Sequence, residues 1–420
     1  MTLRGRDGGR LDTVVVGAGL AGLACALDLC RAGQRVALLE ASDGVGGRMR
    51  TDARDGFLLD RGFQVFNTAY PQVKRRIDLR VLRLRPFTPG FVVHTPTGPV
   101  RLTDPTRDRK AAASLLRHRA LPLRDLAALA AITVGDALLP TKLLKHRSDA
   151  TVAASLTRAG LSDATVQDLL RPFLSGVFLE DRLETSARFF HLVWRSMVRG
   201  TLGLPAKGIG AVPAQLARAL PGGVLRLETP VADVTTSGVL LADGEELPAP
   251  AVVVATDAAT AARLLPGLPV PGGRTVTTYY HAAPTSPMTE PTLLVDGTGS
   301  VLNTCVLTEV TASYAPPGTS LVATSVLSAD EPGTHDAVLR RLAEMYDTDT
   351  SAWSRVATCT VPSALPAMPP PWPLSRPTRF GPARYVCGDH RATGSVQGAL
   401  SSGTRAAREV RADAAGRCQL

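Results

Sequence analysis

The sequence has no run of about eighteen or more apolar residues, so no membrane-crossing helix is expected. Its first ten residues, MTLRGRDGGR, are polar and lack the apolar segment and small-residue cleavage site of a secretory signal. Together these absences predict a cytoplasmic protein. Cysteine is sparse, with six in 420 residues, and neither the cysteines nor the seven histidines show metal-ligand spacing. No metal site is therefore predicted.

Lysine is scarce as well: five of the 47 basic residues are lysine, at positions 74, 110, 142, 145 and 207. The net charge of +10 suggests a nucleic-acid partner, because clustered basic residues bind phosphates. The arginines, however, are scattered along the chain, and only residues 75–85 and 101–109 are denser. We therefore expect no nucleic acid, and interpret the dense stretch as a solvated face or as attraction to an acidic substrate or a membrane surface.

A chain of this length exceeds what one hydrophobic core usually organises, so two lobes are expected. Residues 12–17 read as an apolar strand, 20–32 as a helix and 35–40 as a second apolar strand, which together make a βαβ unit. The next strand region is expected at 55–66, and residues 70–105, rich in Arg and Pro, are expected to be irregular.

A helical pattern is expected over about 109–200. Its most apolar part, residues 124–146, is either a core-facing helix hairpin or an amphipathic face that contacts a membrane or a lipophilic substrate. From residue 224 the period changes to two, and turns at Ser237-Gly238 and Asp243-Gly244 predict a β-meander. More strands follow to about residue 330, and then a helix at about 335–346. The chain closes with a strand, a turn and a long helix.

The stretch VVVGAGLAGLACALDL joins the first strand to the first helix. Gly17 permits a tight turn, Gly19 lets the backbone approach a pyrophosphate, and Gly22 lets helix and strand pack closely. The N-terminus of the helix offers N–H groups to the phosphates. Glu40 stands at the tip of the second strand, where its carboxylate can accept hydrogen bonds from both hydroxyls of a ribose and disfavours a 2′-phosphate. A dinucleotide site is therefore predicted here.

A second glycine turn follows this acid, because GVGGRMR places Gly46, Gly47 and Arg48 directly after it. Here the sequence resembles the flavin-containing amine oxidase superfamily, which includes monoamine and polyamine oxidases, protoporphyrinogen oxidase and the phytoene desaturases. The resemblance implies FAD, with Arg48 approaching its pyrophosphate. The segment LDRGFQVF resembles the family's stretch beside the flavin ring and is closest to the phytoene-desaturase-like branch.

The end of the chain, YVCGDH followed by GSVQGALSSGTRAA, resembles the family's C-terminal FAD motif. The resemblance implies that Asp389 accepts a hydrogen bond from a ribityl hydroxyl. It also implies that backbone N–H groups from Gly394 to Val396 lie near N1 and O2 of the ring, where negative charge grows on reduction. Val231 matches the strand that holds the adenine, and Ala255 follows the third strand of the FAD lobe. The residues placed against FAD by the resemblance are Gly17, Gly19, Leu20, Ala21, Gly22, Glu40, Ala41, Gly46, Gly47, Arg48, Gly62, Phe63, Gln64, Val231, Ala255, Gly388, Asp389, Ser395, Val396 and Gln397.

Departures from the family pattern bear on the reaction. The amine oxidases usually carry a lysine that holds a water against flavin N5, but no lysine follows Lys207. Ala392 and Thr393 stand where a tyrosine commonly precedes Pro-Gly, so the aromatic pair that brackets an amine has no support. No cysteine occupies the position of a covalent flavin link, which implies non-covalent FAD. These departures favour a desaturase or dehydrogenase that moves a hydride from a C–H of an apolar or polycyclic molecule to flavin N5, with O2 or a quinone as acceptor.

Two alternatives stay open: a flavin amine oxidase acting on a C–N bond with O2, and an FAD-containing isomerase without net redox chemistry. His390 is a candidate acid or base at the flavin edge, or else packs in the turn. Gln64 either faces substrate or pairs with backbone. Trp194-Arg195 and Tyr279-Tyr280 are interpreted as core and lobe-interface residues rather than ligands.

The expected fold class is α/β, with two lobes. A Rossmann-type FAD-binding lobe of glutathione-reductase-like architecture is expected from residues 1–65, 206–261 and 376–420. A mixed α+β substrate lobe is expected from 66–205 and 262–375. The expected partner is an apolar small molecule, and peripheral contact of the cytoplasmic protein with a membrane is compatible with each alternative.

Overall fold

The computed structural model describes residues 10–417 except 104–106, 108–120 and 328, so the start of the expected helical part, 109–120, lies outside the described residues. The chain divides into two compact units: Met1–Gly47, Val212–Pro271 and Ser375–Leu420 form unit 1, and Arg48–Ala211 and Gly272–Leu374 form unit 2. Unit 2 thus takes in residues 48–65 and 206–211, which the sequence assigned to the FAD lobe.

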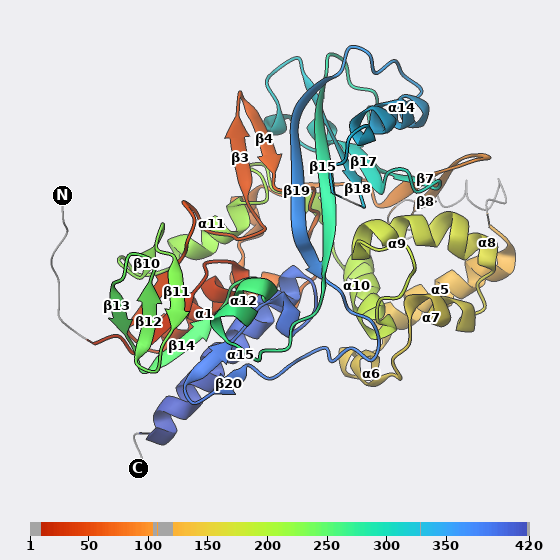
Figure 1. The fold of residues 1–420 in the computed structure, drawn as a ribbon. Helices are drawn as coiled ribbons and strands as arrows, with labels where there is room; N and C mark the ends of the chain where they lie inside the picture. Colours follow the sequence, from red (N-terminus) through yellow and green to blue (C-terminus); the bar gives the residue numbers. More distant parts are fainter. Residues whose placement is uncertain (1–9, 104–106, 108–120, 328, 418–420) are drawn as a thin grey trace. The chain divides into compact units, whose positions relative to one another are not determined.

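Unit 1 is built around a six-stranded sheet and a small three-stranded meander (Figure 1). Its strands are β1 (Thr13–Val16), β2 (Val36–Leu39), β10 (Leu225–Arg226), β11 (Val231–Val234), β12 (Gly238–Leu241), β13 (Glu246–Pro248), β14 (Ala251–Val254), β20 (Arg379–Gly381) and β21 (Arg384–Val386). Its helices are α1 (Leu20–Arg31), α12 (Ala258–Leu264), the short η3 (Asp389–Arg391) and α15 (Val396–Arg417), and α11 (Ala211–Arg218) begins at the boundary.

The central strands of the six-stranded sheet run parallel in the order β10-β2-β1-β14-β21, with β20 antiparallel at the edge. β1, β2 and β14 read TVVV, VALL and AVVV and are buried at every position. Continuous apolar runs of this kind suit strands covered on both faces. The register pairs Val16 with Leu39 on one side and with Val254 on the other, so these strands end level with one another.

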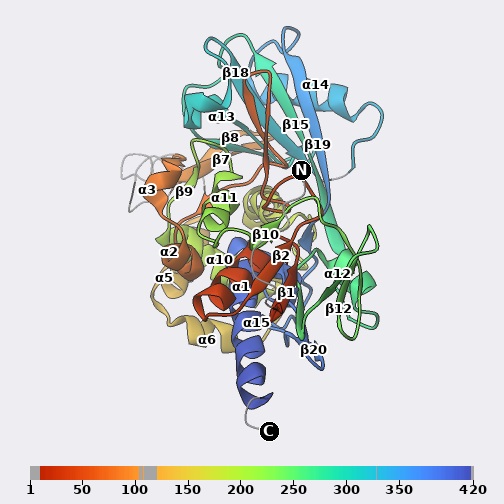
Figure 2. The same ribbon diagram turned by 90° about the vertical axis from the view of Figure 1, so that its left-hand side faces the viewer.

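Helices α1 and α15 lie side by side in unit 1, as Figures 1 and 2 both show. Gly403 of α15 makes the close approach possible, because a Cβ there would stand 2.1 Å from the carbonyl oxygen of Ala21. Ser402 also ties α15 to the sheet, since its Oγ accepts a hydrogen bond from the N–H of Gly388 at 2.9 Å. The N-terminal and C-terminal segments are therefore packed into one unit.

Unit 2 contains a seven-stranded sheet of order β19-β15-β18-β17-β16-β7-β8, a hairpin of β3 and β4, and a three-stranded group. Its strands are β3 (Thr51–Arg54), β4 (Phe57–Asp60), β5 (Phe66–Asn67), β6 (Arg85–Pro86), β7 (Gly90–Thr95), β8 (Gly98–Thr103), β9 (Leu202–Leu204), β15 (Gly273–Ala283), β16 (Leu293–Asp296), β17 (Asn303–Val306), β18 (Ser320–Val326) and β19 (Ser354–Pro366). Its helices are α2 (Pro71–Arg76), α3 (Leu79–Leu82), α5 (Leu123–Leu138), α6 (Thr141–His146), α7 (Val152–Arg158), α8 (Asp163–Thr165), the π-helix η1 (Val166–Leu170), α9 (Arg171–Phe178), α10 (Ala187–Arg199), α13 (Leu307–Val310), η2 (Ala312–Tyr314) and α14 (Thr334–Tyr346).

The two faces of the seven-stranded sheet bury different partners, as the two-residue period of a strand requires. Val92 and Leu294 join the core beneath α14, whereas the next residues, Val93 and Val295, join the core of the helical part. Phe91 of β7 stacks on Phe173 of α9 with ring centroids 3.9 Å apart. The helical region expected up to residue 200 is thus confirmed for its described residues as a layer packed on this sheet.

The expectation that residues 70–105 are irregular is wrong. They contain α2, α3, β6 and the hairpin of β7 and β8. β7 pairs in parallel with β16, about two hundred residues further along, and this distant pairing stabilises a strand whose own sequence, GFVVHT, gives little signal. Pro99 is accommodated because β8 is the edge strand of the sheet. The meander predicted after residue 224 is confirmed by β11, β12 and β13.

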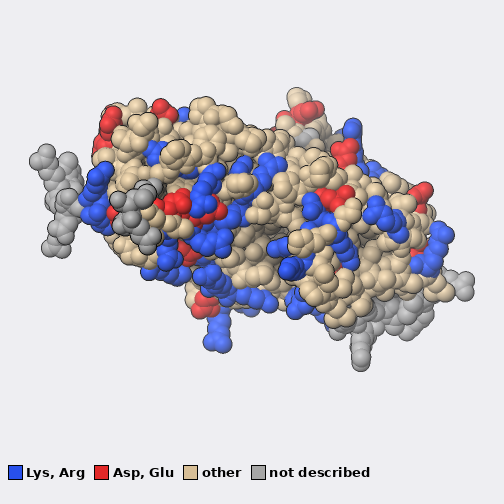
Figure 3. Space-filling view, turned by 90° about the horizontal axis from the view of Figure 1, so that it is seen from below, with Lys and Arg blue, Asp and Glu red and all other residues tan. Residues whose placement is uncertain are grey.

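Charged side chains of both signs are interspersed on the face drawn in Figure 3, where Lys and Arg lie among Asp and Glu and broad neutral areas. Within the described residues, no helix combines the length and the apolar character needed to cross a bilayer.

Candidate functional site

Four parallel strands of unit 1 end together, and a residue predicted to bind the cofactor follows each of them. Gly17 follows β1, Glu40 follows β2 and Ala255 follows β14. Cys387 follows β21, and Gly388 comes next. Backbone hydrogen bonds continue the pairing past the strand ends, from Gly17 N to Leu39 O at 2.7 Å and from Ala255 N to Val16 O at 2.8 Å. In open α/β sheets, ligands bind at this carboxyl edge of the strands.

The first glycine turn is shaped by its three glycines in different ways. Gly17 has φ +98° and lies against Ala255, whose carbonyl oxygen would stand 3.0 Å from a Cβ. Gly22 lies against the turn itself, because a Cβ there would stand 1.9 Å from the carbonyl oxygen of Gly17. Gly19 has no heavy atom within 4 Å of its Cβ position and φ −69°, so no protein atom requires a glycine there. The open space at Gly19, beside the N-terminus of α1, fits a pyrophosphate.

Glu40 is held in place by the chain around it. Its carboxylate accepts hydrogen bonds from Ala18 N at 2.7 Å, from Ser42 N at 3.1 Å and from Ser42 Oγ at 2.8 Å. The N–H of Thr229 donates to the carbonyl of Glu40 at 2.8 Å, which brings the start of β11, with Val231, close to this strand end. Ala41, the next residue, is exposed. Sequence reasoning missed Ser42, although its position two residues after the acid is a readable signal.

The second glycine turn contacts the first. The N–H of Gly46 donates to the carbonyl of Ala18 at 2.9 Å, and a Cβ on Gly47 would stand 3.7 Å from the Cα of Gly19. Gly46 and Gly47 both have positive φ, at +119° and +58°. The structure therefore brings the two glycine-rich segments together around the same open space.

The C-terminal motif reaches the same edge of the sheet. Gly388 has φ +154°. The ring of His390 lies so close to it that a Cβ on residue 388 would stand 2.5 Å from the ring. Asp389 is buried, and its Oδ1 accepts from the N–H of His390 at 3.0 Å. Ser395 precedes α15, and its Oγ accepts from Gly398 N at 3.1 Å. Val396 and Gln397 form the first turn of this helix, whose N–H groups point out of its N-terminus.

Four of the predicted cofactor residues belong to unit 2. Arg48 donates from Nη1 to the carbonyl of Ala364 at 2.6 Å, so its guanidinium is tied to β19. Gln64 donates from Nε2 to the carbonyl of Arg48 at 2.8 Å, which engages its amide with backbone. Gly62 is buried, and Phe63 meets Phe87 edge-on with centroids 6.3 Å apart.

Asp60, which was not among the predicted site residues, is the buried hub of this segment. Its carboxylate accepts hydrogen bonds from Thr51 Oγ1 at 2.5 Å, Ile209 N at 2.9 Å and Tyr314 Oη at 3.1 Å. Its backbone carbonyl accepts from Tyr280 Oη at 2.6 Å. Burial raises the pKa of Asp60 to about 6, against the opposing effect of these donors. Asp60 therefore fixes β3, β4 and the loop at residue 209 to one another.

The sequence profile of the flavin containing amine oxidoreductases matches residues 20–411. The chain belongs to this family. It is a flavin-dependent oxidoreductase with the α/β fold of the amine oxidase superfamily.

Relatives of this flavin oxidoreductase differ in what they act on. The coproporphyrinogen III oxidase of Propionibacterium freudenreichii subsp. freudenreichii is 28% identical over 329 residues, which are 63% of this chain and 60% of the relative. The phytoene dehydrogenase of Streptomyces griseus is 29% identical over 290 residues, 61% and 57% of the two chains. The matches thus span about three fifths of these relatives. The solved structure of cyclohexylamine oxidase from Brevibacterium oxydans has a TM-score of 0.68 at 18% identity and covers 96% of this chain and 99% of its own.

Two pairs of residues in this flavin oxidoreductase, at positions 194–195 and 279–280, make hydrogen bonds within the protein. Tyr279 and Tyr280 are buried, with hydroxyls bonded to Asp330 and to the Asp60 carbonyl. Trp194 donates from Nε1 to Thr133 Oγ1 at 3.1 Å. Arg195 caps α5 by donating to the carbonyls of Ala137 and Leu139 at 2.8 and 2.9 Å. The polar atoms of these four residues thus make hydrogen bonds within the protein, and their assignment as core and interface residues stays a prediction.

Proposed function

We propose that the flavin is FAD, bound without a covalent link. The support is the group of four strand ends in unit 1, where the space at Gly19 suits a pyrophosphate and the carboxylate of Glu40 suits a ribose. FMN has neither a pyrophosphate nor an adenosine, so it would leave this part of the site unused. Cys387, the residue after β21, is fully buried.

We propose further that the enzyme dehydrogenates a largely apolar carbon substrate. The single observation that carries this proposal is that Tyr279 and Tyr280 are buried with their hydroxyls engaged, in a chain that has no lysine after Lys207. Neither tyrosine is therefore available to bracket an amine, and the chain has no lysine after Lys207 that could hold a water against flavin N5. Bound FAD would supply a hydride acceptor, and O2 or a quinone would serve as the final electron acceptor.

The protein's own contribution is orientation and an apolar surrounding. Phe63 lies half-buried at the edge of a cluster that includes Phe87, Tyr280 and Leu204. The partly buried rings of Phe63 and Phe87, which pack against this core, would offer an apolar surface to a hydrocarbon substrate. Gln64 acts as a positioning residue through its bond to the Arg48 backbone. His390, only 1% exposed beside Asp389, remains the candidate for moving a proton at the flavin edge.

The test is the visible spectrum of the purified protein, recorded without oxygen before and after addition of amines, polyenes and polycyclic compounds. We expect a flavin band that only an apolar carbon substrate bleaches. Bleaching by an amine, with hydrogen peroxide released in air, would instead establish an amine oxidase, the second candidate, which the 55% identity over 67 residues to the putrescine oxidase of Kocuria rosea favours. Product formation at an unchanged oxidation level would establish an isomerase.

We also propose peripheral contact with a membrane through α5 and α6. One face of α5 packs Ala128, Leu129 and Ile132 on the helical core. The other face presents Leu123 and Leu138, 79% and 76% exposed. Apolar side chains on an exposed helix face, followed by the basic residues of α6, are typical of helices that rest on anionic lipid.

A further inference from the structure

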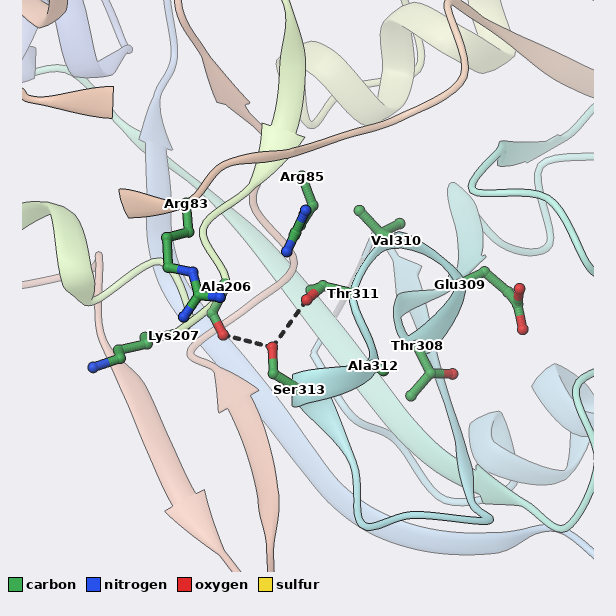
Figure 4. Close-up of a pocket in the computed structure, with 10 residues that line it drawn as sticks. All are labelled: Arg83, Arg85, Ala206, Lys207, Thr308, Glu309, Val310, Thr311, Ala312 and Ser313. Atoms are coloured by element: carbon green, nitrogen blue, oxygen red, sulfur yellow. Dashed lines mark hydrogen bonds between the residues drawn. The ribbon is translucent and has the colours of Figure 1, made fainter. Parts of the chain in front are cut away.

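An open groove of about 590 Å³ lies within unit 2, and all the residues that line it belong to that unit (Figure 4). It is lined by Arg83, Arg85, Ala206, Lys207, Thr308, Glu309, Val310, Thr311, Ala312 and Ser313. The groove includes the end of the arginine-dense stretch at residues 75–85, which the proposed function leaves without a role.

The guanidinium groups of Arg83 and Arg85 face this groove, whereas the ammonium end of Lys207 extends away from it (Figure 4). Arg83, Arg85 and Lys207 are all exposed, and their side chains make no hydrogen bond or ion pair with any residue that the structure describes. The one acidic lining residue, Glu309, directs its carboxylate away from them (Figure 4). Like charges placed together without a counter-ion create a positive potential that attracts anions.

The cations stand on backbone that is fixed locally. Arg83 ends α3 in the left-handed conformation, φ +50°, with its N–H bonded to the carbonyl of Arg80. Arg85 pairs with Leu204 in the ladder of β6 and β9. The N–H of Ala206 donates to the carbonyl of Leu82 at 3.2 Å, which joins the loop before Lys207 to the end of α3.

The far side of the groove is tied to the same loop. Ser313 Oγ donates to the carbonyl of Ala206 at 2.6 Å and lies 2.9 Å from Thr311 Oγ1. Beyond Lys207, Asp60 and Thr51 hold the loop through the N–H groups of Ile209 and Gly210. The backbone that carries the groove residues is therefore fixed, and it places two guanidinium groups and the hydroxyls of Thr311 and Ser313 around one space.

We infer that this groove binds a small organic anion through its carboxylate or phosphate oxygens. Guanidinium groups bind the paired oxygens of carboxylates and phosphates. The volume lies in the range of small-molecule sites, roughly 300–1,000 Å³. The inference is independent of the proposed function, because it needs neither FAD nor an apolar substrate.

The test is isothermal titration of the flavin-loaded protein with citrate and, separately, with pyrophosphate. We expect one of the two to bind, and the tighter probe identifies the carboxylate or the phosphate class. Arg83→Gln and Arg85→Gln should each weaken that binding at least fivefold. Raised salt should weaken it as well, since the contacts are ionic.

Arg158→Gln serves as the matched control, because Arg158 is an exposed arginine at the end of α7, outside the groove. Its affinity for the probe should equal that of the unaltered protein. The flavin spectrum and melting temperature of every variant show whether it is folded. The inference is overturned if neither probe binds, or if folded groove variants bind as tightly as the control.

Discussion

Gly19 and Gly22 lie three residues apart in one turn, yet a side chain would meet different surroundings at each. At Gly22 a Cβ meets backbone at 1.9 Å, whereas at Gly19 it meets nothing within 4 Å. Gly22→Ala should lower the free energy of unfolding by about 1–3 kcal/mol, the usual cost of overpacking. Gly19→Ala should fold normally but bind FAD at least tenfold more weakly, about 1.4 kcal/mol, because the methyl group occupies the space for the pyrophosphate.

Urea unfolding of the apoproteins and FAD titration of each variant measure the two effects separately. Gly33→Ala is a control for the handling of glycine variants, since Gly33 lies beyond the end of α1 with nothing near its Cβ position. Its positive φ should cost stability without changing FAD affinity. Full FAD affinity in Gly19→Ala would contradict the placement of the pyrophosphate at this turn.

Asp60 should make the free energy of unfolding fall as the pH rises. Its pKa is raised by burial from 3.8 to about 6, so between these values the unfolded chain releases the proton more readily than the folded one. This group therefore favours folding below about pH 4, and its contribution falls by about 3 kcal/mol as pH rises through 6. Asp60→Asn cannot ionise, so its unfolding free energy relative to the unaltered protein should rise across this window. Urea unfolding from pH 4 to 7 measures the difference, and a pH-independent difference would show that Asp60 ionises normally.

At the scale of elements, α5 is the helix with the clearest unassigned face. Leu123, Val134 and Leu138 are exposed and fall on one side of the helix. Replacing Leu123 and Leu138 by serine should abolish flotation with vesicles of phosphatidylcholine and phosphatidylserine, because the apolar anchor is removed. Leu227→Ser alters an exposed leucine of unit 1 and should leave flotation unchanged. Equal flotation of all variants would refute the membrane contact of α5.

Elements were predictable where the signal is local. The turn at Gly17, α1 and the strand ending at Glu40 follow from apolar runs and glycine spacing within thirty residues or so. β7 was not predictable, because its partner β16 lies far along the chain. The groove was not predictable either, because Arg85 comes beside Leu204 and the loop that follows it only when β6 pairs with β9. Likewise, nothing around Asp60 in the sequence indicates that Ile209 and Tyr314 converge on its carboxylate.

At the scale of the whole molecule, unit 1 is assembled from three separated stretches of chain. Gly17, Glu40, Ala255 and Gly388 reach one edge only after β1, β2, β14 and β21 have paired. A ligand that binds at this edge binds the folded chain and not the unfolded one. Ligand binding should therefore stabilise the molecule against unfolding.

This coupling distinguishes FAD from FMN. FAD at a hundred times its dissociation constant should add about 2.7 kcal/mol to the stability of the apoprotein and raise its melting temperature. ADP should produce part of this shift, because it carries the pyrophosphate and ribose that suit the space at Gly19 and the carboxylate of Glu40. FMN, which lacks both the pyrophosphate and the adenosine, should produce little. Thermal unfolding with each compound measures the shifts. An FMN shift as large as that of FAD, with none from ADP, would place the main binding energy outside the βαβ unit and overturn the assignment of FAD.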